Sequence, residues 1–145
     1  MAEKRFDELD FGDEAEIRPD VGMDRVTLFA EATGMKVGRF LDHEAARKEG
    51  LPSAIVPGVM SQGLLTAAVH SWVSDAVIES IDTIFRAPLQ VDSSPTCRIT
   101  VTDRDEDSGA VELDLVVVNE ANETRVLGTA KVRPRVDASG RETAR

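Results

Sequence analysis

The stretch VMSQGLLTAAVHSWV, residues 59–73, limits the possible folds more than any other part of the sequence. It is apolar almost all the way round at helical spacing, which is typical of a helix buried on most of its sides. The segments that follow it alternate apolar and polar residues, which is typical of strands with one buried face. A buried helix followed by a run of strands predicts an α+β fold, with the helix packed on one face of an antiparallel sheet.

Four segments after this helix have strand character: IDTIFRAPLQV (81–91), CRITVTD (97–103), VELDLVVVN (111–119) and RVLGTAKVRPRV (125–136). Pro88 indicates that the first of them is an edge strand or is bulged. Polar turn residues separate the later segments, in DRDEDSG and NEANE. DEAEIR (13–18) is expected to form a first strand. An antiparallel sheet wrapped around a long central helix is the hot-dog fold, which we therefore expect.

Two shorter helices are expected before the central one. In DRVTLFAEATG, Asp24 is the predicted N-cap and Gly34 the predicted stop. In DHEAARKEG, Asp42 is the predicted cap and Gly50 ends the helix. The chain has no internal repeat and no low-complexity linker, so we expect one domain over residues 1–136 and a flexible polar tail over 137–145.

The formal net charge of −10 disfavours nucleic acids and anionic membranes as partners. No apolar run reaches membrane-spanning length, and the acidic N-terminus has no apolar core of the kind found in secretory signals. One cysteine, Cys97, cannot form an internal disulfide, which agrees with a cytoplasmic location. Two histidines and one cysteine without ligand spacing predict no metal site, and we expect no cofactor.

Several segments of the chain resemble the motifs of one known protein family, and they occur in the same order. DFGDEAEI is similar to a first strand, and VTLFAEATG resembles an "FA-x-x-[ST]-G" helix. LDHEAARKEGLPSAIVPGVMSQGLL resembles a "D-x-x-x-A-x-x-x-G-(x)-x-x-IV-H-G" passage, and TIFRAPLQVDS an "F-x-x-P-V-x-x-G-D" strand. These are features of the MaoC-like hot-dog family, which includes (R)-specific enoyl-CoA hydratases and acyl dehydratases. The resemblance runs from about Phe6 to Val136 and implies an acyl-CoA or acyl-carrier thioester ligand, hence a role in fatty acid or lipid metabolism.

Hydratases of that family carry the loop D-x-N-P-x-H, whose Asp and His hold and activate water. Laid over this chain from Gly34, the pattern puts Met35 at the Asp and Phe40 at the His. Neither side chain transfers protons, so the resemblance implies a site without its catalytic dyad.

Gly58 stands where the family's helix N–H binds the thioester carbonyl, a role that needs no side chain. The alternative is that Gly58 only allows a tight turn into the helix. The substrate-binding candidates are thus Gly58, Val59, Met35, Phe40 and Gln62.

Other residues could replace the dyad. His43 and Asp42 are weak catalytic candidates, although a solvent-facing position and a helix cap explain them equally. Gln62 could orient a water but could not deprotonate one. His70 lies twelve residues beyond Gly58 along the helix, about 18 Å away, and is expected in the core or at an interface. Lys36 and Arg39 are candidate contacts for a phosphorylated carrier, or else ordinary solvated cations.

Three functions remain open. The chain could be the non-catalytic subunit of a heteromeric enoyl-CoA hydratase or dehydratase, with Met35 and Phe40 filling the vacant pocket. It could be a homodimeric hydratase, dehydratase or thioesterase with rearranged catalytic residues. It could also be a homodimeric protein that binds an acyl ligand without catalysis. The first hypothesis requires a second hot-dog subunit that carries the dyad.

Overall fold

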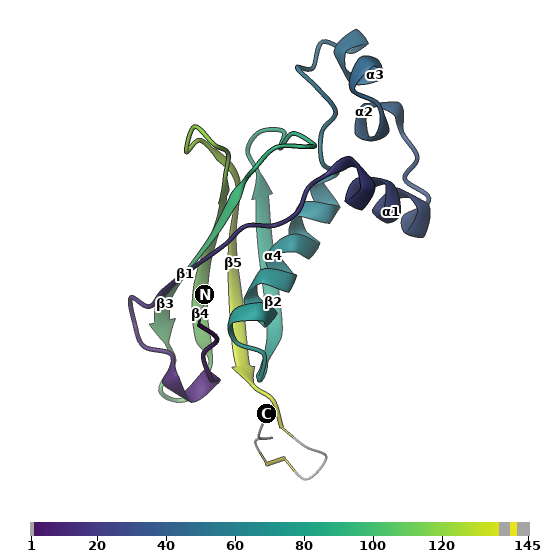
Figure 1. The fold of residues 1–145 in the computed structure, drawn as a ribbon. Helices are drawn as coiled ribbons and strands as arrows, with labels where there is room; N and C mark the ends of the chain where they lie inside the picture. The colour runs from purple at the N-terminus through teal and green to yellow at the C-terminus, as the bar shows by residue number, and fades with distance from the viewer. Residues whose placement is uncertain (1, 137–139, 142–145) are drawn as a thin grey trace.

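The computed structural model describes residues 2–136 and 140–141, and it contains one five-stranded antiparallel sheet with a long helix against it (Figure 1). The strand order is β1-β3-β4-β5-β2. The strands are β1 (Glu14–Ile17), β2 (Ala76–Phe85), β3 (Thr96–Arg104), β4 (Val111–Val118) and β5 (Thr124–Pro134). The α+β hot-dog arrangement predicted from the sequence is therefore confirmed. Most of the tail predicted over 137–145 lies outside the described residues.

The central helix α4 (Gly58–Trp72) packs on the sheet, as the apolar pattern predicts. Its buried side chains include Leu65, Val69 and Trp72, each at most 2% exposed. The inner face of the sheet meets them with alternate residues of two strands, which are Cys97, Ile99 and Val101 of β3 and Val111, Leu113, Leu115 and Val117 of β4. The predicted alternation of these two strands is thus confirmed, and it places the core between α4 and the sheet.

Strand β2 differs from its prediction at both ends. It begins at Ala76, five residues before the predicted Ile81, and it stops at Phe85. Pro88 has no N–H to donate to a ladder, so the chain leaves the sheet before it. The residues beyond it pair instead with the segment that leads into α4, where the N–H of Val56 donates to Leu89 O at 2.7 Å. Strand β2 is an edge strand, because β5 is its only neighbour among the described strands of the sheet.

Three helices precede α4: α1 (Met23–Thr33), α2 (Gly38–Leu41) and α3 (His43–Lys48). A short 3₁₀ turn, η1 (Phe6–Glu8), lies near the N-terminus. The expected helix stop at Gly34 is confirmed, since this residue is left-handed with φ 76° and its N–H donates to Ala30 O. The predicted cap Asp24 is wrong: the N-cap is Gly22, and Asp24 lies in the first turn. The cap prediction for Asp42 is confirmed, because its carboxylate accepts from the N–H groups of Glu44 and Ala45.

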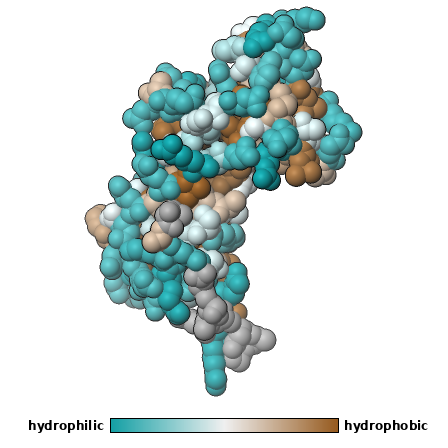
Figure 2. Space-filling model, viewed as in Figure 1, coloured by the Kyte–Doolittle hydropathy of each residue, from teal (hydrophilic) through white to brown (hydrophobic). Residues whose placement is uncertain are grey.

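The helical segment, residues 23–57, gathers α1, α2 and α3 at the end of the molecule where α4 begins (Figure 1). Apolar surface shows on this part of the molecule in Figure 2. Its exposed apolar side chains include Leu28, at 63% exposure, and Val37, at 42%. Within the described part of the chain, no helix has the length and hydrophobicity needed to cross a membrane.

Candidate functional site

Among the described residues, no side chain caps the N-terminus of α4 with a hydrogen bond. Pro57 is the N-cap and makes no side-chain hydrogen bond to the helix, and the N–H of Ser61 donates to Pro57 O at 3.1 Å. The N–H groups that come before Ser61, beginning at Gly58, therefore stand at the positive end of the helix dipole. Such a group of donors can stabilise an oxygen that gains negative charge.

The ring of Phe85 lies directly against Gly58. A Cβ atom added at Gly58 would lie 3.4 Å from two ring carbons of Phe85, which is close to the limit for an unstrained contact. Phe85 itself is 51% exposed at the end of β2. A methyl group at position 58 would thus touch the Phe85 ring at the short end of ordinary van der Waals contact.

One turn later, Gln62 is tied to the sheet. Its amide nitrogen donates to Thr83 Oγ1 at 3.0 Å, and both residues are partly buried. Thr83 and Phe85 are on the inner face of β2, so the first two turns of α4 contact the end of this strand. Val59 is 59% exposed on the first turn of α4. The Gln62 amide is positioned to bind a polar group, but no side chain on these two turns can donate or remove a proton near neutral pH.

The two residues at the predicted dyad positions are both partly buried. Met35 follows the left-handed Gly34, and its N–H donates to Thr33 Oγ1 at 3.4 Å. Phe40 lies in α2 and packs against the hydrophobic core. The backbone N–H of Ile55 donates to Arg39 O at 3.0 Å, which ties α2 to the segment that leads into α4. The loop is therefore attached to the core by apolar contacts and a backbone hydrogen bond.

His43 has hydrogen-bond partners at both ring nitrogens. Its Nε2 lies 2.8 Å from Asp92 Oδ2, and its Nδ1 accepts from the N–H of Ala54 at 3.1 Å. Because Nδ1 accepts a backbone N–H, the proton is on Nε2 and is donated to Asp92. The other carboxylate oxygen of Asp92 accepts from the N–H of Met23 at 2.9 Å. The His43 hydrogen bond and then the Met23 N–H hold the pKa of the Asp92 carboxyl below its usual range.

This cluster of His43, Asp92, Ala54 and Met23 joins α1, α3 and two loops. A solvent-facing position was one expectation for His43, and the structure instead gives it a partner 49 residues away in the sequence. A general base needs a free nitrogen that faces its substrate, and neither ring nitrogen of His43 is free. The candidate Asp42 is likewise occupied, as the cap of α3.

The remaining candidates are at the surface. Lys36 pairs with Glu31 at 3.0 Å and Arg39 with Glu49 at 3.3 Å, and all four side chains are about half exposed. Exposed pairs of this kind are weak and exchange readily with other partners. His70 is exposed near the end of α4, so its expected place in the core of this chain is wrong.

An apolar cleft between α1 and α4 was missed from the sequence. It has a volume of about 390 Å³ and is lined by Leu28, Phe29 and Ala32 of α1 and by Met60 and Leu64 of α4, with Asp20 and Arg25 at its polar side. This volume lies in the range of small-molecule sites. The available signal was the pair of apolar residues Leu28 and Phe29 next to each other on α1, since only one of two such neighbours can face the core.

Comparison with solved structures identifies the architecture. R-hydratase PhaJ1 from Pseudomonas aeruginosa superposes with a TM-score of 0.83 at 21% identity, over 92% of this chain and 86% of that one. The fold is that of the MaoC-like hot-dog proteins. A MaoC-like dehydratase has a TM-score of 0.81 at 18% identity, over 90% of this chain and 42% of that one. A chain of the ChsH1–ChsH2 complex from Mycobacterium tuberculosis has a TM-score of 0.77 at 21% identity, over 87% of this chain and 98% of that one.

No family model and no curated protein matches the sequence. At these identities, the MaoC-like hot-dog likeness establishes the fold, and the chemistry depends on the residues of this chain. Those residues supply an uncapped helix start, a fixed amide and an apolar cleft. The titratable candidates His43 and Asp42 are committed to structural hydrogen bonds.

Proposed function

We propose that this protein binds an acyl thioester and is the non-catalytic subunit of a heteromeric enoyl-CoA hydratase or dehydratase. The proposal depends mainly on one observation: each candidate position for an acid or base is either apolar or already bound in a structural hydrogen bond. Met35 and Phe40 are at the positions where the resemblance expects Asp and His. His43 has partners at both nitrogens, and Asp42 caps α3. Hydration requires a group that takes a proton from water, and none of these four side chains is available for it.

The binding half of the proposal depends on two features. The uncapped N–H groups at the start of α4 would donate hydrogen bonds to the thioester carbonyl oxygen, which the partial positive charge at this end of the helix stabilises. The cleft between α1 and α4 would accept the apolar acyl chain. Lys36 and Arg39 would contact a phosphate group by exchanging their carboxylate partners for it.

The proposal that this chain is part of a heteromer is supported by similar structures that are themselves complexes of two different chains. One of the similar structures is a complex of two chains, ChsH1 and ChsH2, and another is the HadBC complex of a 3R-hydroxyacyl-ACP dehydratase. In a pair of this kind, a second hot-dog subunit would supply the Asp and His, and this chain would supply part of the acyl site. We place the pair in the cytoplasm. Thiols stay reduced in that compartment, which agrees with a chain whose one cysteine, Cys97, is free and buried.

Calorimetry with a short trans-2-enoyl-CoA tests the binding half. We expect measurable binding by the purified protein without loss of the enoyl absorbance. Gly58→Ala should weaken binding, because its methyl group stands at the start of α4 and contacts the Phe85 ring. Gly63→Ala is the matched control, since a methyl group there meets nothing within 4 Å. Equal affinity of the two variants would contradict close contact between the thioester and residue 58, and turnover by the wild type would exclude the non-catalytic role.

A further inference from the structure

The cleft between α1 and α4 is polar at one end only. Ala32, Leu28 and Arg25 follow one another along α1 about one turn apart, so they form a stripe along the cleft. Ala32 precedes the loop of Met35, where the resemblance places the catalytic residues of the family. Arg25 comes seven residues before Ala32, about 10 Å away along the helix axis. An acyl chain that begins beside this loop and follows the stripe therefore ends at Arg25.

Arg25 is oriented by the second polar residue of the cleft, Asp20. The Nε of Arg25 donates to Asp20 Oδ2 at 3.3 Å, and Asp20 Oδ1 accepts the N–H of Gly22 at 2.9 Å. The Gly22 N–H and then the Arg25 guanidinium hold the pKa of the Asp20 carboxyl below its usual range, so this group is ionised and only accepts. The terminal nitrogens of Arg25 make no hydrogen bond with the residues that the structure describes. The end of the cleft therefore offers free donors beside a fixed acceptor.

The charge around this pair is negative. Three carboxylates converge on Gly22, since a Cβ atom there would lie 2.9 Å from Asp24 Oδ1, 3.1 Å from Asp20 Oδ1 and 3.8 Å from Asp92 Oδ1. These carboxylates outnumber the nearby cations even when His43, the partner of Asp92, is protonated. A carboxylate brought to Arg25 would be repelled by them. An ammonium group would have no acceptor for the Arg25 donors and would place a second cation beside them.

We propose that the acyl chain bound in this cleft carries a hydroxyl group at its far end, which accepts a hydrogen bond from Arg25 and donates one to Asp20. A hydroxyl group combines one donor with two acceptor lone pairs and carries no charge, so it matches both partners. A methyl end would displace water from the pair without replacing its hydrogen bonds. This inference rests on the acyl-thioester binding proposed above and specifies the substrate class, a thioester of a hydroxylated acyl chain.

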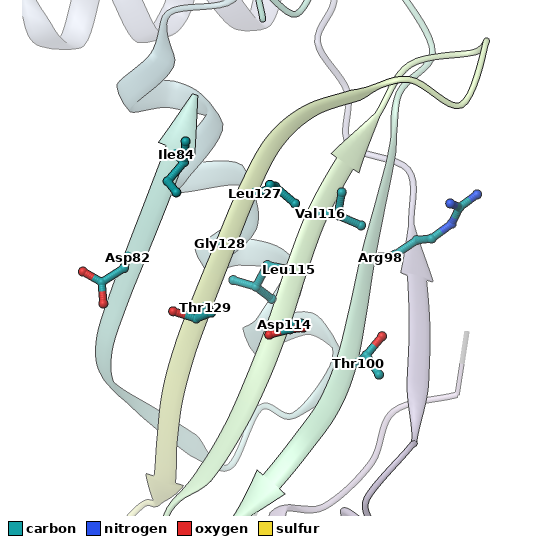
Figure 3. A pocket seen from close by; sticks show the side chains of 10 residues that line it. All are labelled: Asp82, Ile84, Arg98, Thr100, Asp114, Leu115, Val116, Leu127, Gly128 and Thr129. Carbon is teal, nitrogen blue, oxygen red and sulfur yellow. The ribbon is translucent and has the colours of Figure 1, made fainter. Parts of the chain in front are cut away.

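A second hollow, of about 530 Å³, lies on the outer face of the sheet (Figure 3). It is lined by Asp114, which precedes the buried Leu115 on β4, so it opens on the face opposite α4. A thioester held at the start of α4 cannot place its chain there. This hollow also contains an arginine, Arg98, but its Nε donates to Glu16 and its terminal Nη1 to Asn122. Arg98 is therefore the matched control for Arg25.

Calorimetry on the purified full chain tests the inference with octanoyl-, decanoyl- and dodecanoyl-CoA, each ending in a methyl, a hydroxyl or a carboxylate group. Comparing end groups at one chain length cancels the contributions of the CoA and of the thioester. At the length that reaches Arg25, the hydroxyl form should bind roughly two- to tenfold more tightly than the methyl form, as expected for one or two hydrogen bonds at a half-exposed site. The carboxylate form should bind most weakly.

Two variants locate the effect. Arg25→Met keeps an apolar stem but removes the donors, so the ratio between the hydroxyl and methyl forms should fall to about one, whereas Arg98→Met should keep the wild-type ratio. Asp20→Asn still accepts the Gly22 N–H but removes one negative charge, so the carboxylate form should bind it more tightly than it binds the wild type.

Equal binding of the methyl and hydroxyl forms at every length, a preference for the carboxylate, or an equal loss of preference in Arg25→Met and Arg98→Met would overturn the inference. In each of these cases the thioesters still bind, so the acyl-thioester function itself would stand. Failure of every thioester to bind would overturn both proposals.

Discussion

His43 Nε2 lies 2.8 Å from Asp92 Oδ2, and this contact joins α3 to a loop 49 residues further along the chain. Asp92 adopts a left-handed backbone conformation with φ 64°, and its second carboxylate oxygen accepts the N–H of Met23 at the start of α1. One aspartate therefore fixes two helices of the helical segment. It also explains why His43 is not available as a base.

Asp92→Asn should make the free energy of unfolding less dependent on pH in the acid range. Asparagine tolerates the left-handed conformation and can still accept the Met23 N–H, so the variant removes mainly the charge-assisted hydrogen bond from His43 to the carboxylate. We expect a loss of about 0.5 kcal/mol near neutral pH, typical of a half-exposed pair. Folding lowers the pKa of the Asp92 carboxyl from its usual 3.8. Its contribution is therefore present above pH 3.8 and is lost as the pH falls through the folded pKa.

Urea unfolding of the wild type and of Asp92→Asn across the acid range measures this effect. The difference between their free energies of unfolding should shrink toward zero below the folded pKa. A difference that is constant with pH would show that the charge of the Asp92 carboxylate does not strengthen its hydrogen bond from His43.

Asp42→Ala should loosen α3. The carboxylate of Asp42 accepts the N–H of Glu44 at 2.9 Å and that of Ala45 at 3.4 Å, and losing an N-cap typically costs about 1 kcal/mol. Native-state hydrogen exchange of the Ala46 amide, which donates to Asp42 O, should speed up by roughly fivefold. Asp42→Asn should exchange nearly as the wild type does, because asparagine also caps helices. Equal acceleration in both variants would assign the effect to the charge instead of the cap.

The Cys97 thiol should not react in the folded protein. Burial raises its pKa to about 12, and the thiolate is the reactive form. At mildly alkaline pH, an aromatic disulfide reagent should label Cys97 only after denaturant is added. Labelling of the native protein at the rate of a free thiol would mean that the inner face of β3 opens readily.

Ala32→Phe should separate long from short acyl ligands. Ala32 lines the cleft between α1 and α4, and a phenyl ring there would fill part of its volume. If the acyl chain occupies the cleft, the affinity for a long-chain enoyl-CoA should fall roughly tenfold, whereas the affinity for a short-chain one should be unchanged. Ala32→Ser is the size-matched control and should bind both ligands normally. An equal loss for both chain lengths would place the acyl chain elsewhere.

Features with a local cause could be predicted from the sequence. The all-round apolar pattern of residues 59–73 identifies α4, and the alternation around Ile99 and Leu115 identifies β3 and β4. Caps depend on residues a few positions away, and Asp42 and Gly34 were found for this reason. Asp24 looked like a cap of the same kind, but the N–H of Met23 is bound by Asp92, which lies 69 residues further along the chain.

The features that sequence reasoning missed are non-local. The partner of His43 comes from a different loop, and the cleft between α1 and α4 exists only after both helices pack. Strand β2 ends early because the residues after Pro88 pair with the segment before α4, which no window of the sequence contains. The contact of Phe85 with Gly58 likewise joins two elements that are far apart in sequence.

The most direct test of the central claim is hydration of a short trans-2-enoyl-CoA, followed by loss of the enoyl absorbance. The wild type and a Met35→Asp/Phe40→His double variant should be assayed side by side, each without any partner. We predict that the wild type is inert and that the double variant gains measurable activity, because the variant restores an acid and a base beside an intact binding site. Turnover by the wild type would contradict the account, since it would require a proton-transferring group other than the residues assigned here.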